Sequence, residues 1–124
     1  FDGRFTLACI ANGRWYGGGF NPVPDAEPDD GNPHVLLVRD VSRLTVSKVI
    51  GKYKKGLYAE LPQYIRYYKC KKIRIVCDKT SEINLDGELL MKKEATFEIM
   101  PRHIRFFYPK GLSYRAKKKE TAKV

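Results

Sequence analysis

Two neighbouring stretches of the chain carry residue types that could do phosphate or metal chemistry. Three consecutive glycines, Gly17, Gly18 and Gly19, follow an aromatic pair, and four carboxylates then fall within residues 25–30. Glycine lets a ligand or another backbone come close, and aspartate, glycine and proline together form sharp turns. A glycine-rich loop followed by an acidic turn suits phosphate and metal chemistry, although an ordinary surface loop can have the same composition.

The positive charge of the chain gathers in its middle. The net charge is +10, and between residues 48 and 74 the only acid is Glu60. Such a field favours an anionic partner, which could be nucleic acid, phosphate esters or an anionic membrane surface. A solvated lysine face is the plain alternative. The basic residues of this stretch are Lys48, Lys52, Lys54, Lys55, Arg66, Lys69, Lys71, Lys72 and Arg74.

The length and composition indicate one folded domain. A chain of 124 residues with 43% apolar residues can build its own core, and no apolar run is long enough to cross a bilayer. No secretory signal is visible, and three cysteines without paired ligand spacing indicate reduced thiols of a cytoplasmic protein. Because the chain opens at Phe1 and not at methionine, we expect it to be a fragment of something longer.

Hydrophobic periodicity predicts the elements that must position these stretches. A helix is expected at about 42–55, with Ser42 as its N-cap and Gly56 as its stop. Asp86-Gly87 is the best hairpin turn in the chain. Strands are expected at 5–10, 14–16, 34–39, 64–69, 72–77, 82–85, 88–91, 95–100 and 102–108, the third of them covered on both faces.

Many short strands and one helix indicate a mainly β fold, which we expect to be an antiparallel β-sandwich with one main α-helix. There is no internal repeat and no second hydrophobic unit. We therefore expect one domain over residues 1–114, followed by a basic, disordered tail over residues 115–124.

Three blocks of sequence occur in the order Ala11-Asn-Gly-Arg-x-Tyr-Gly-Gly-Gly19, Pro24-Asp-Ala-x-x-Asp-Asp-Gly31 and Leu85-Asp-Gly-Glu88. In this order and rough spacing, they resemble the C-terminal domain of the diacylglycerol kinase-type lipid kinases of bacteria, within the NAD kinase-like superfamily. The likeness covers about residues 5–109. It implies a two-domain enzyme that transfers the γ-phosphate of ATP to a lipid hydroxyl.

The resemblance covers only one half of such an enzyme. In the family an N-terminal α/β domain with a Gly-Gly-Asp-Gly-Thr motif binds most of the ATP, and that motif is absent here. We expect this C-terminal β-sandwich domain to fold but to be inactive alone. The implied partners are a lipid substrate, the anionic inner face of the cytoplasmic membrane and the chain's own N-terminal domain. Nucleic acid is not expected, and a homodimer is left open.

The resemblance also implies a structural magnesium ion, Mg²⁺, on the acidic turn. The matching positions are Glu27, Asp30 and Asn32, with Asp30 giving its carboxylate and the other two their carbonyl oxygens. Magnesium prefers hard oxygen ligands and keeps several waters, so three protein ligands suffice. Pro28 and the Asn32-Pro33 pair depart from the family pattern and could alter the shape of the loop.

Asp86 and Glu88 match the family's catalytic Asp-Gly-Glu. A carboxylate can orient or deprotonate the attacking hydroxyl in phosphoryl transfer, and the resemblance does not separate the two residues in that role. Without the resemblance, Asp86-Gly87 is an ordinary turn.

The glycine stretch would form a cleft loop, with Asn12 as a nearby polar contact and Gly17, Gly18 and Gly19 as the wall. A tight strand connection required by packing is the alternative. Six lysines could hold the parent enzyme on an anionic bilayer, namely Lys52, Lys54, Lys55, Lys69, Lys71 and Lys72.

Two other functions remain open at this point. Basic strands with tyrosine and phenylalanine could stack bases in a nucleic-acid-binding β domain. A related kinase could act on a soluble substrate such as NAD. Within the lipid reading, the acceptor is also open among diacylglycerol, monoacylglycerol, a sphingoid base and phosphatidylglycerol.

Overall fold

The computed structural model describes residues 1–111, and its strands form two antiparallel sheets. The first sheet has the order β1-β2-β3, and the second is a β4-β5 hairpin. The strands are β1 (Phe5–Ala11), β2 (His34–Arg39), β3 (Ile65–Lys69), β4 (Lys72–Leu85) and β5 (Glu88–Glu98).

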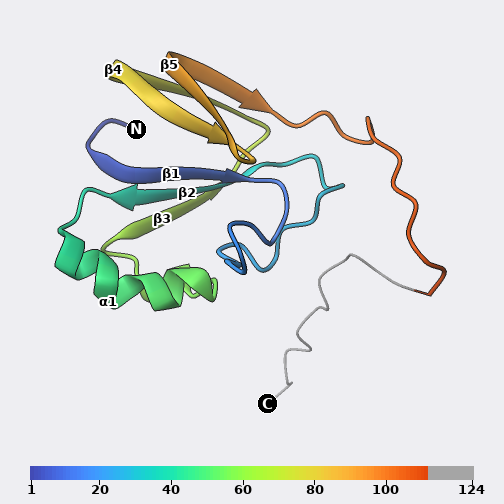
Figure 1. Ribbon diagram of the computed structural model, residues 1–124, viewed down its shortest axis with the longest axis horizontal. Helices are drawn as coiled ribbons and strands as arrows, with labels where there is room; N and C mark the ends of the chain where they lie inside the picture. The colour runs from blue at the N-terminus through green and yellow to red at the C-terminus, as the bar shows by residue number, and fades with distance from the viewer. Residues whose placement is uncertain (112–124) are drawn as a thin grey trace.

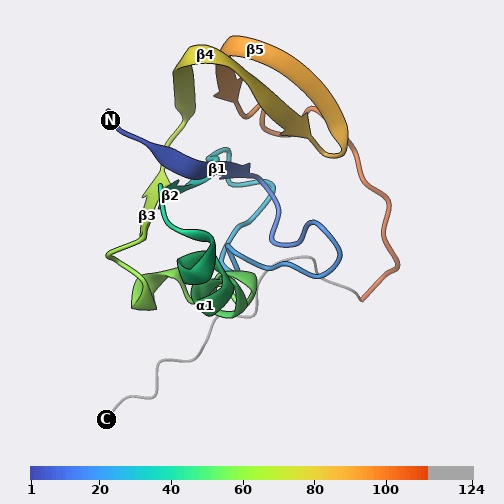
Figure 2. The same cartoon turned by 60° about the vertical axis from the view of Figure 1, so that its left-hand side comes forward.

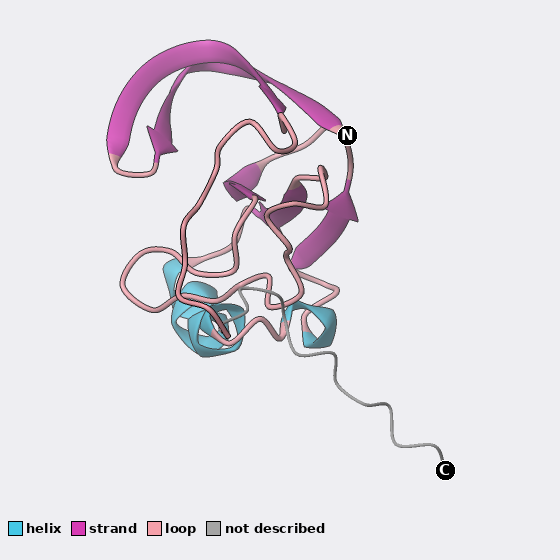
Figure 3. Cartoon of the chain, turned by 90° about the vertical axis from the view of Figure 1, so that its right-hand side faces the viewer, coloured by secondary structure: helices cyan, strands magenta, loops and turns pink. Residues whose placement is uncertain are grey.

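The elements lie in three layers. Figures 1 and 2 show the three-stranded sheet between the curved β4-β5 hairpin on one side and the helix α1 (Arg43–Lys54) on the other. Figure 3 shows the same separation, with strands at one end and helices at the other. A short 3₁₀ helix, η1 (Tyr58–Glu60), links α1 to β3. The predicted fold class, mainly β with antiparallel sheets and one main α-helix, is confirmed.

The core forms on the helix side of β2. Leu36 and Val38 lie in one buried cluster with Tyr53 of α1 and Ile65 of β3. Because side chains alternate along a strand, the equally buried Val35 lies on the opposite face, towards the hairpin. The prediction that residues 34–39 form a strand covered on both faces is confirmed for all but the exposed Arg39.

The helix α1 has the ends that its sequence predicts. The backbone N–H of Thr45 donates to the hydroxyl of Ser42, which caps the N-terminus at 3.2 Å. At the other end, the N–H of Leu57 donates to the carbonyl of Lys52, and that of Gly56 donates to the carbonyl of Tyr53. This pair of bonds is a Schellman motif, with Gly56 in the left-handed conformation at φ +72°.

The β4-β5 hairpin is longer than the sequence suggested. Residues 72–77 and 82–85 form one strand, with an irregular register between Val76 and Ser81, and residues 88–91 and 95–98 also form one strand. The turn at Asp86-Gly87 is confirmed, because Leu85 pairs directly with Glu88. An irregular stretch lets one long strand curve, and single-sequence periodicity breaks there in the same way as at a turn.

Two predicted strands are wrong. Residues 14–16 form no strand, only one bridge between Tyr16 and Phe20. Residues 102–108 also form none, and the Phe107 side chain there is 98% exposed. Alternating apolar residues favour a strand, but a strand also needs a neighbouring edge for its backbone hydrogen bonds, and this stretch pairs with none within residues 1–111.

The predicted tail and the membrane-span prediction are the two remaining sequence-based expectations. The predicted disordered tail, residues 115–124, and the last residues of the predicted domain lie outside the part that the structure describes. Within residues 1–111, no helix combines the length and the apolar character that a membrane span requires.

The end of α1 generates a stability prediction. A β-carbon on Gly56 would fall 2.7 Å from the carbonyl oxygen of Asn21 and also against Pro24, in a conformation that side chains disfavour. We expect Gly56→Ala to lower the free energy of unfolding in urea by at least about 1–2 kcal/mol. The matched control is Gly51→Ala inside the same helix, where nothing lies within 4 Å. Gly51→Ala should raise the free energy of unfolding by about 0.5–1 kcal/mol. If the two variants changed this free energy equally, the close packing of Gly56 against Asn21 and Pro24 would be contradicted.

Candidate functional site

Asp30 of the acidic turn lies in a cluster built by the pairing of β2 with β3. His34 at the start of β2 is the register partner of Lys69 at the end of β3, so both side chains lie beside the turn. The Lys69 ammonium, Nζ, is 2.6 Å from the Asp30 oxygen Oδ2. The Asp30 side chain is 17% exposed and that of Lys69 is 44% exposed. The pair is therefore partly shielded from solvent.

The other oxygen of the same carboxylate is held by the turn itself. The backbone N–H of Asn32 donates to Asp30 Oδ1 at 2.8 Å, and the Asn32 side-chain amide donates to the Asp30 carbonyl at 2.7 Å. Such bonds are typical of an aspartate that closes a turn on its own backbone. Both oxygens of the Asp30 carboxylate thus have close donors within the chain.

These contacts set the charge of Asp30. Burial by itself raises the pKa of the carboxyl group, but the Lys69 ammonium and the Asn32 N–H favour the ionised form by more. The pKa of Asp30 is therefore lowered from its ordinary value. At neutral pH the turn presents a carboxylate and not a carboxylic acid.

His34 closes the inner side of the cluster. Its side chain is 2% exposed, its Nδ1 forms a 2.8 Å hydrogen bond with the Tyr67 hydroxyl, and its Nε2 is 3.6 Å from Asp30 Oδ2. Burial disfavours the charged imidazole and lowers the pKa of His34, although Asp30 opposes this shift. The imidazole is therefore neutral at pH 7, and Lys69 is the cation that contacts the carboxylate.

The predicted magnesium ligands do not fit a divalent ion as they lie. A magnesium ion would bind Asp30 Oδ2, which the Lys69 ammonium contacts, and the Glu27 carbonyl accepts the Asp30 N–H at 3.1 Å. Within residues 1–111, no three histidine, cysteine, aspartate or glutamate side chains gather where they could hold a metal ion between them. Asp30 is the one predicted ligand that would use its carboxylate, and that carboxylate is already paired with Lys69.

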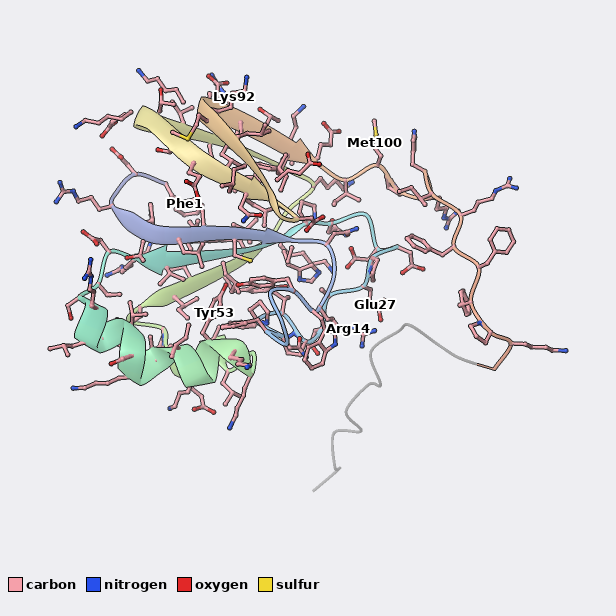
Figure 4. The ribbon with its side chains drawn as sticks, in the orientation of Figure 1. Phe1, Arg14, Glu27, Tyr53, Lys92 and Met100 are labelled. Atoms are coloured by element: carbon pink, nitrogen blue, oxygen red, sulfur yellow. The ribbon has the colours of Figure 1, made fainter. Side chains whose placement is uncertain are left out.

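The three glycines form a closed loop. The Tyr16 and Phe20 backbones exchange hydrogen bonds of 3.0 and 2.9 Å, and all three enclosed glycines have positive φ angles. Only glycine adopts such angles at low cost, so the sequence of this loop follows from its geometry. The hydroxyl of Tyr16 also bonds that of Tyr53 at 2.8 Å, which fixes the loop to α1. Figure 4 shows Tyr53 between the helix and the strands.

A surface hollow opens where this loop meets the end of α1. It has a volume of about 360 Å³ and is lined by Trp15, Gly19, Asn21, Lys54 and Lys55. The Trp15 side chain is 67% exposed. The hollow thus combines an exposed aromatic ring with two ammonium groups.

The six lysines predicted to face a membrane do not share one role. Lys52, Lys69 and Lys72 pair with Glu60, Asp30 and Glu98 at distances of 2.9, 2.6 and 3.0 Å. Within residues 1–111, no ion pair engages Lys54, Lys55 or Lys71. Lys54 instead lies 5.3 Å from the centre of the Phe20 ring. Half of the expected positive patch is therefore neutralised by neighbouring carboxylates.

Asp86 and Glu88 lie on the tight turn between β4 and β5. Asp86 has φ +50° and Gly87 φ +108°, as expected of a two-residue turn of the Asp-Gly type, and the Gly87 N–H donates to Asn84 Oδ1 at 2.8 Å. Both carboxylates are exposed. Figures 1 and 2 show this turn towards the same end of the molecule as the loop that follows β1. That placement is compatible with the predicted cleft, and the roles of Asp86, Glu88, Asn12 and the glycines stay predictions.

Sequence reasoning missed Lys69 and Tyr67 as members of the Asp30 cluster. The sequence places Lys69 in the basic patch and Tyr67 in the strand expected at residues 64–69, and it links neither residue to the acidic turn. The signal lay in strand pairing, because a strand that begins at His34 and an adjacent antiparallel strand that ends at Lys69 set these residues opposite each other. The periodicity of a single sequence does not show that these two strands are neighbours.

The chain matches a family described as the YegS C-terminal NAD kinase beta sandwich-like domain, over residues 2–108. Among named relatives, it is 27% identical over 105 residues to a "putative lipid kinase" of Staphylococcus aureus strain MRSA252. It is 26% identical over 105 residues to another protein of that name from strain JH9. Each alignment covers 85% of this chain and 34% of the relative, so the chain spans about a third of their length.

The lowered pKa of Asp30 generates a pH prediction. A carboxyl group with a lowered folded-state pKa adds stability above its unfolded pKa of about 4, and this stability is lost as pH falls through the folded pKa. We therefore expect Asp30→Asn to lower the free energy of unfolding at pH 7 by about 1 kcal/mol, because the pair is partly exposed. The difference from the wild type should shrink as pH falls below about 4.

Urea unfolding of both proteins between neutral and acidic pH would measure this difference. Asp78→Asn is the matched control, because Asp78 is exposed and no ion pair engages it within residues 1–111. A difference for Asp30→Asn that stays constant through the acidic range would contradict the assignment.

Proposed function

The chain belongs to the family of YegS C-terminal NAD kinase beta sandwich-like domains, and from that membership we propose that it is part of an ATP-dependent lipid kinase. The enzyme would transfer the γ-phosphate of ATP to the hydroxyl of a diacylglycerol-like lipid. The observation that carries the proposal is the family match over residues 2–108, together with relatives named as lipid kinases. This chain supplies one side of the cleft, and an N-terminal domain supplies most of the ATP site.

In this proposal the carboxylates of the β4-β5 turn act on the lipid hydroxyl. Phosphoryl transfer depends mainly on positioning and on charge stabilisation, and a carboxylate within hydrogen-bond reach can orient the hydroxyl or take its proton. A two-residue turn between paired strands holds Asp86 and Glu88 in a defined geometry, yet leaves both exposed to a substrate. Asp86, Glu88 or the two together would serve as the general base.

A candidate contact surface for the N-terminal domain lies in the segment that follows β5. Residues 104–107 lie outside the strands and helices of the described chain and carry exposed apolar side chains, including Phe106 and Phe107. Exposed apolar side chains grouped in this way are typical of an interaction surface. We assign this segment to contact with the N-terminal domain, where it would gain the strand partner that it lacks here. The chain alone would then be inactive.

The catalytic assignment predicts the effect of Asp86→Asn in the whole protein that contains this chain. Asparagine tolerates the positive φ angle of residue 86, so the turn should persist while its charge is lost. We expect turnover of ATP with diacylglycerol to fall by roughly 10²–10⁴-fold, with little change in thermal stability. Glu88→Gln, measured in parallel, would apportion the role between the two carboxylates.

Asp78→Asn on the same hairpin is the control and should keep normal turnover. Near-normal turnover of Asp86→Asn and Glu88→Gln alike would remove the base assignment. Phosphorylation of NAD with no turnover of any lipid would favour the soluble-substrate alternative.

We further assign the hollow beside the glycine loop to the anionic membrane surface on which the lipid lies. Tryptophan favours the interface between water and lipid, and each lysine near an anionic surface adds about 1 kcal/mol. Trp15 is exposed, while Lys54 and Lys55 line the same hollow and have no competing carboxylate within residues 1–111. Lys52, Lys69 and Lys72 are excluded because carboxylates already pair with them.

This assignment can be measured directly, because Trp15 is the only tryptophan of the chain. We expect its fluorescence to shift to the blue with vesicles rich in phosphatidylglycerol, and not with vesicles of phosphatidylcholine alone. Lys54→Ala with Lys55→Ala should weaken partitioning by roughly tenfold or more. Lys92→Ala with Lys93→Ala is the matched control, because Lys92 lies on the β4-β5 hairpin, across the three-stranded sheet from α1 (Figure 4). An unshifted spectrum, or equal losses in both double variants, would rule out this surface.

A further inference from the structure

The acidic turn needs a cation for a physical reason. Four carboxylates, those of Asp25, Glu27, Asp29 and Asp30, lie within six residues, and the Asp30 carboxylate lies 3.6 Å from the ring of the buried His34. A carboxylate removed from water is costly unless a positive charge or hydrogen-bond donors compensate it. The fold must therefore provide a counter-charge at Asp30 Oδ2.

The chain provides that charge itself. Lys69 reaches Oδ2 at 2.6 Å from the end of β3, and the backbone register fixes its position, because Lys69 is paired with His34 and His34 lies four residues after Asp30. The Asn32 N–H takes the second oxygen. A magnesium ion would sit about 2.1 Å from a ligand oxygen and would require near-octahedral coordination. It could reach Oδ2 only by expelling the ammonium, since two cations would otherwise repel each other at that oxygen.

We propose that the Lys69 ammonium is the built-in cation of the acidic turn and takes the place of a divalent metal ion there. The inference does not depend on the proposed kinase activity, and a magnesium ion carried by ATP is a separate ion. An attached ammonium has a high effective concentration beside its carboxylate, and a chelator cannot remove it. The turn, and with it the start of β2, therefore keeps its structure in the absence of metal.

The first test compares the thermal unfolding of the wild-type chain in EDTA and in magnesium chloride. We expect the two midpoints to agree within about 1 °C, whereas a site of millimolar affinity would raise the midpoint by roughly 6 °C at about 10 mM magnesium. In two-dimensional NMR, the Asn32 amide, which donates to Asp30 Oδ1, should not move as magnesium is added. A midpoint raised by several degrees together with a moving Asn32 signal would overturn the proposal.

The second test removes the ammonium. Lys69→Met should unfold at a lower temperature in EDTA, and magnesium should restore part of the loss because Oδ2 is then free to bind it. Lys69→Arg keeps a cation and should remain insensitive to magnesium. Lys71→Met, at an exposed position that no ion pair engages within residues 1–111, is the matched control and should behave as the wild type.

The proposal would be overturned if Lys69→Met matched the wild type in EDTA, or if it lost stability without any response to magnesium. Should Lys69→Met fail to fold in EDTA, folding restored by magnesium would support the proposal, and failure in both conditions would overturn it.

Discussion

The strand β2 is buried on both faces, and this burial fixes the positions of the elements around it. Val35 and Leu36 are almost fully buried although they point to opposite sides of the sheet, so each side must be covered by another element. The helix α1 and the loop around Val23 cover one face, and the β4-β5 hairpin lies over the other. A strand in this position has no freedom of register, because a shift by one residue would exchange its two faces. Everything attached to its ends is therefore held in place.

That fixed register has consequences for charge. It sets His34 opposite Lys69, and Oδ2 of Asp30, just before the strand, lies 2.6 Å from the ammonium and 3.6 Å from the imidazole. Charge that looked available for an external partner is thus partly used inside the domain. The same is true of Lys52 and Lys72, so the number of lysines in the middle of the chain overstates the positive surface offered to a membrane. Lys54 and Lys55, which no carboxylate pairs within residues 1–111, line a hollow together with the exposed Trp15.

The candidate site residues of the proposed enzyme lie on rigid parts of the domain. The candidate carboxylates lie on a two-residue turn, and the glycines lie in a loop closed by the Tyr16–Phe20 bridge and tied to Tyr53. Both are short connections on ordered elements, which suits groups that must hold a substrate in one geometry. The exposed segment at residues 104–107 has the opposite character, because it belongs to neither sheet and to no helix within residues 1–111. In the proposed enzyme, the rigid turn and loop would contact the substrate, and the exposed segment would contact the N-terminal domain.

Features that rest on local interactions could be predicted from the sequence alone. Ser42 and Gly56 mark the ends of α1 because capping involves residues only a few positions apart, and Asp86-Gly87 marks a turn because few other pairs tolerate its backbone angles. The family was also recognisable, since its blocks are contiguous runs around Gly17–Gly19, Asp30 and Asp86. The pairing of Lys69 with Asp30, 39 positions away, and the absence of a strand at residues 102–108 could not be predicted in this way. Both depend on which strand edges become neighbours, and that choice is made by burial and pairing across the whole domain and not by the residues concerned.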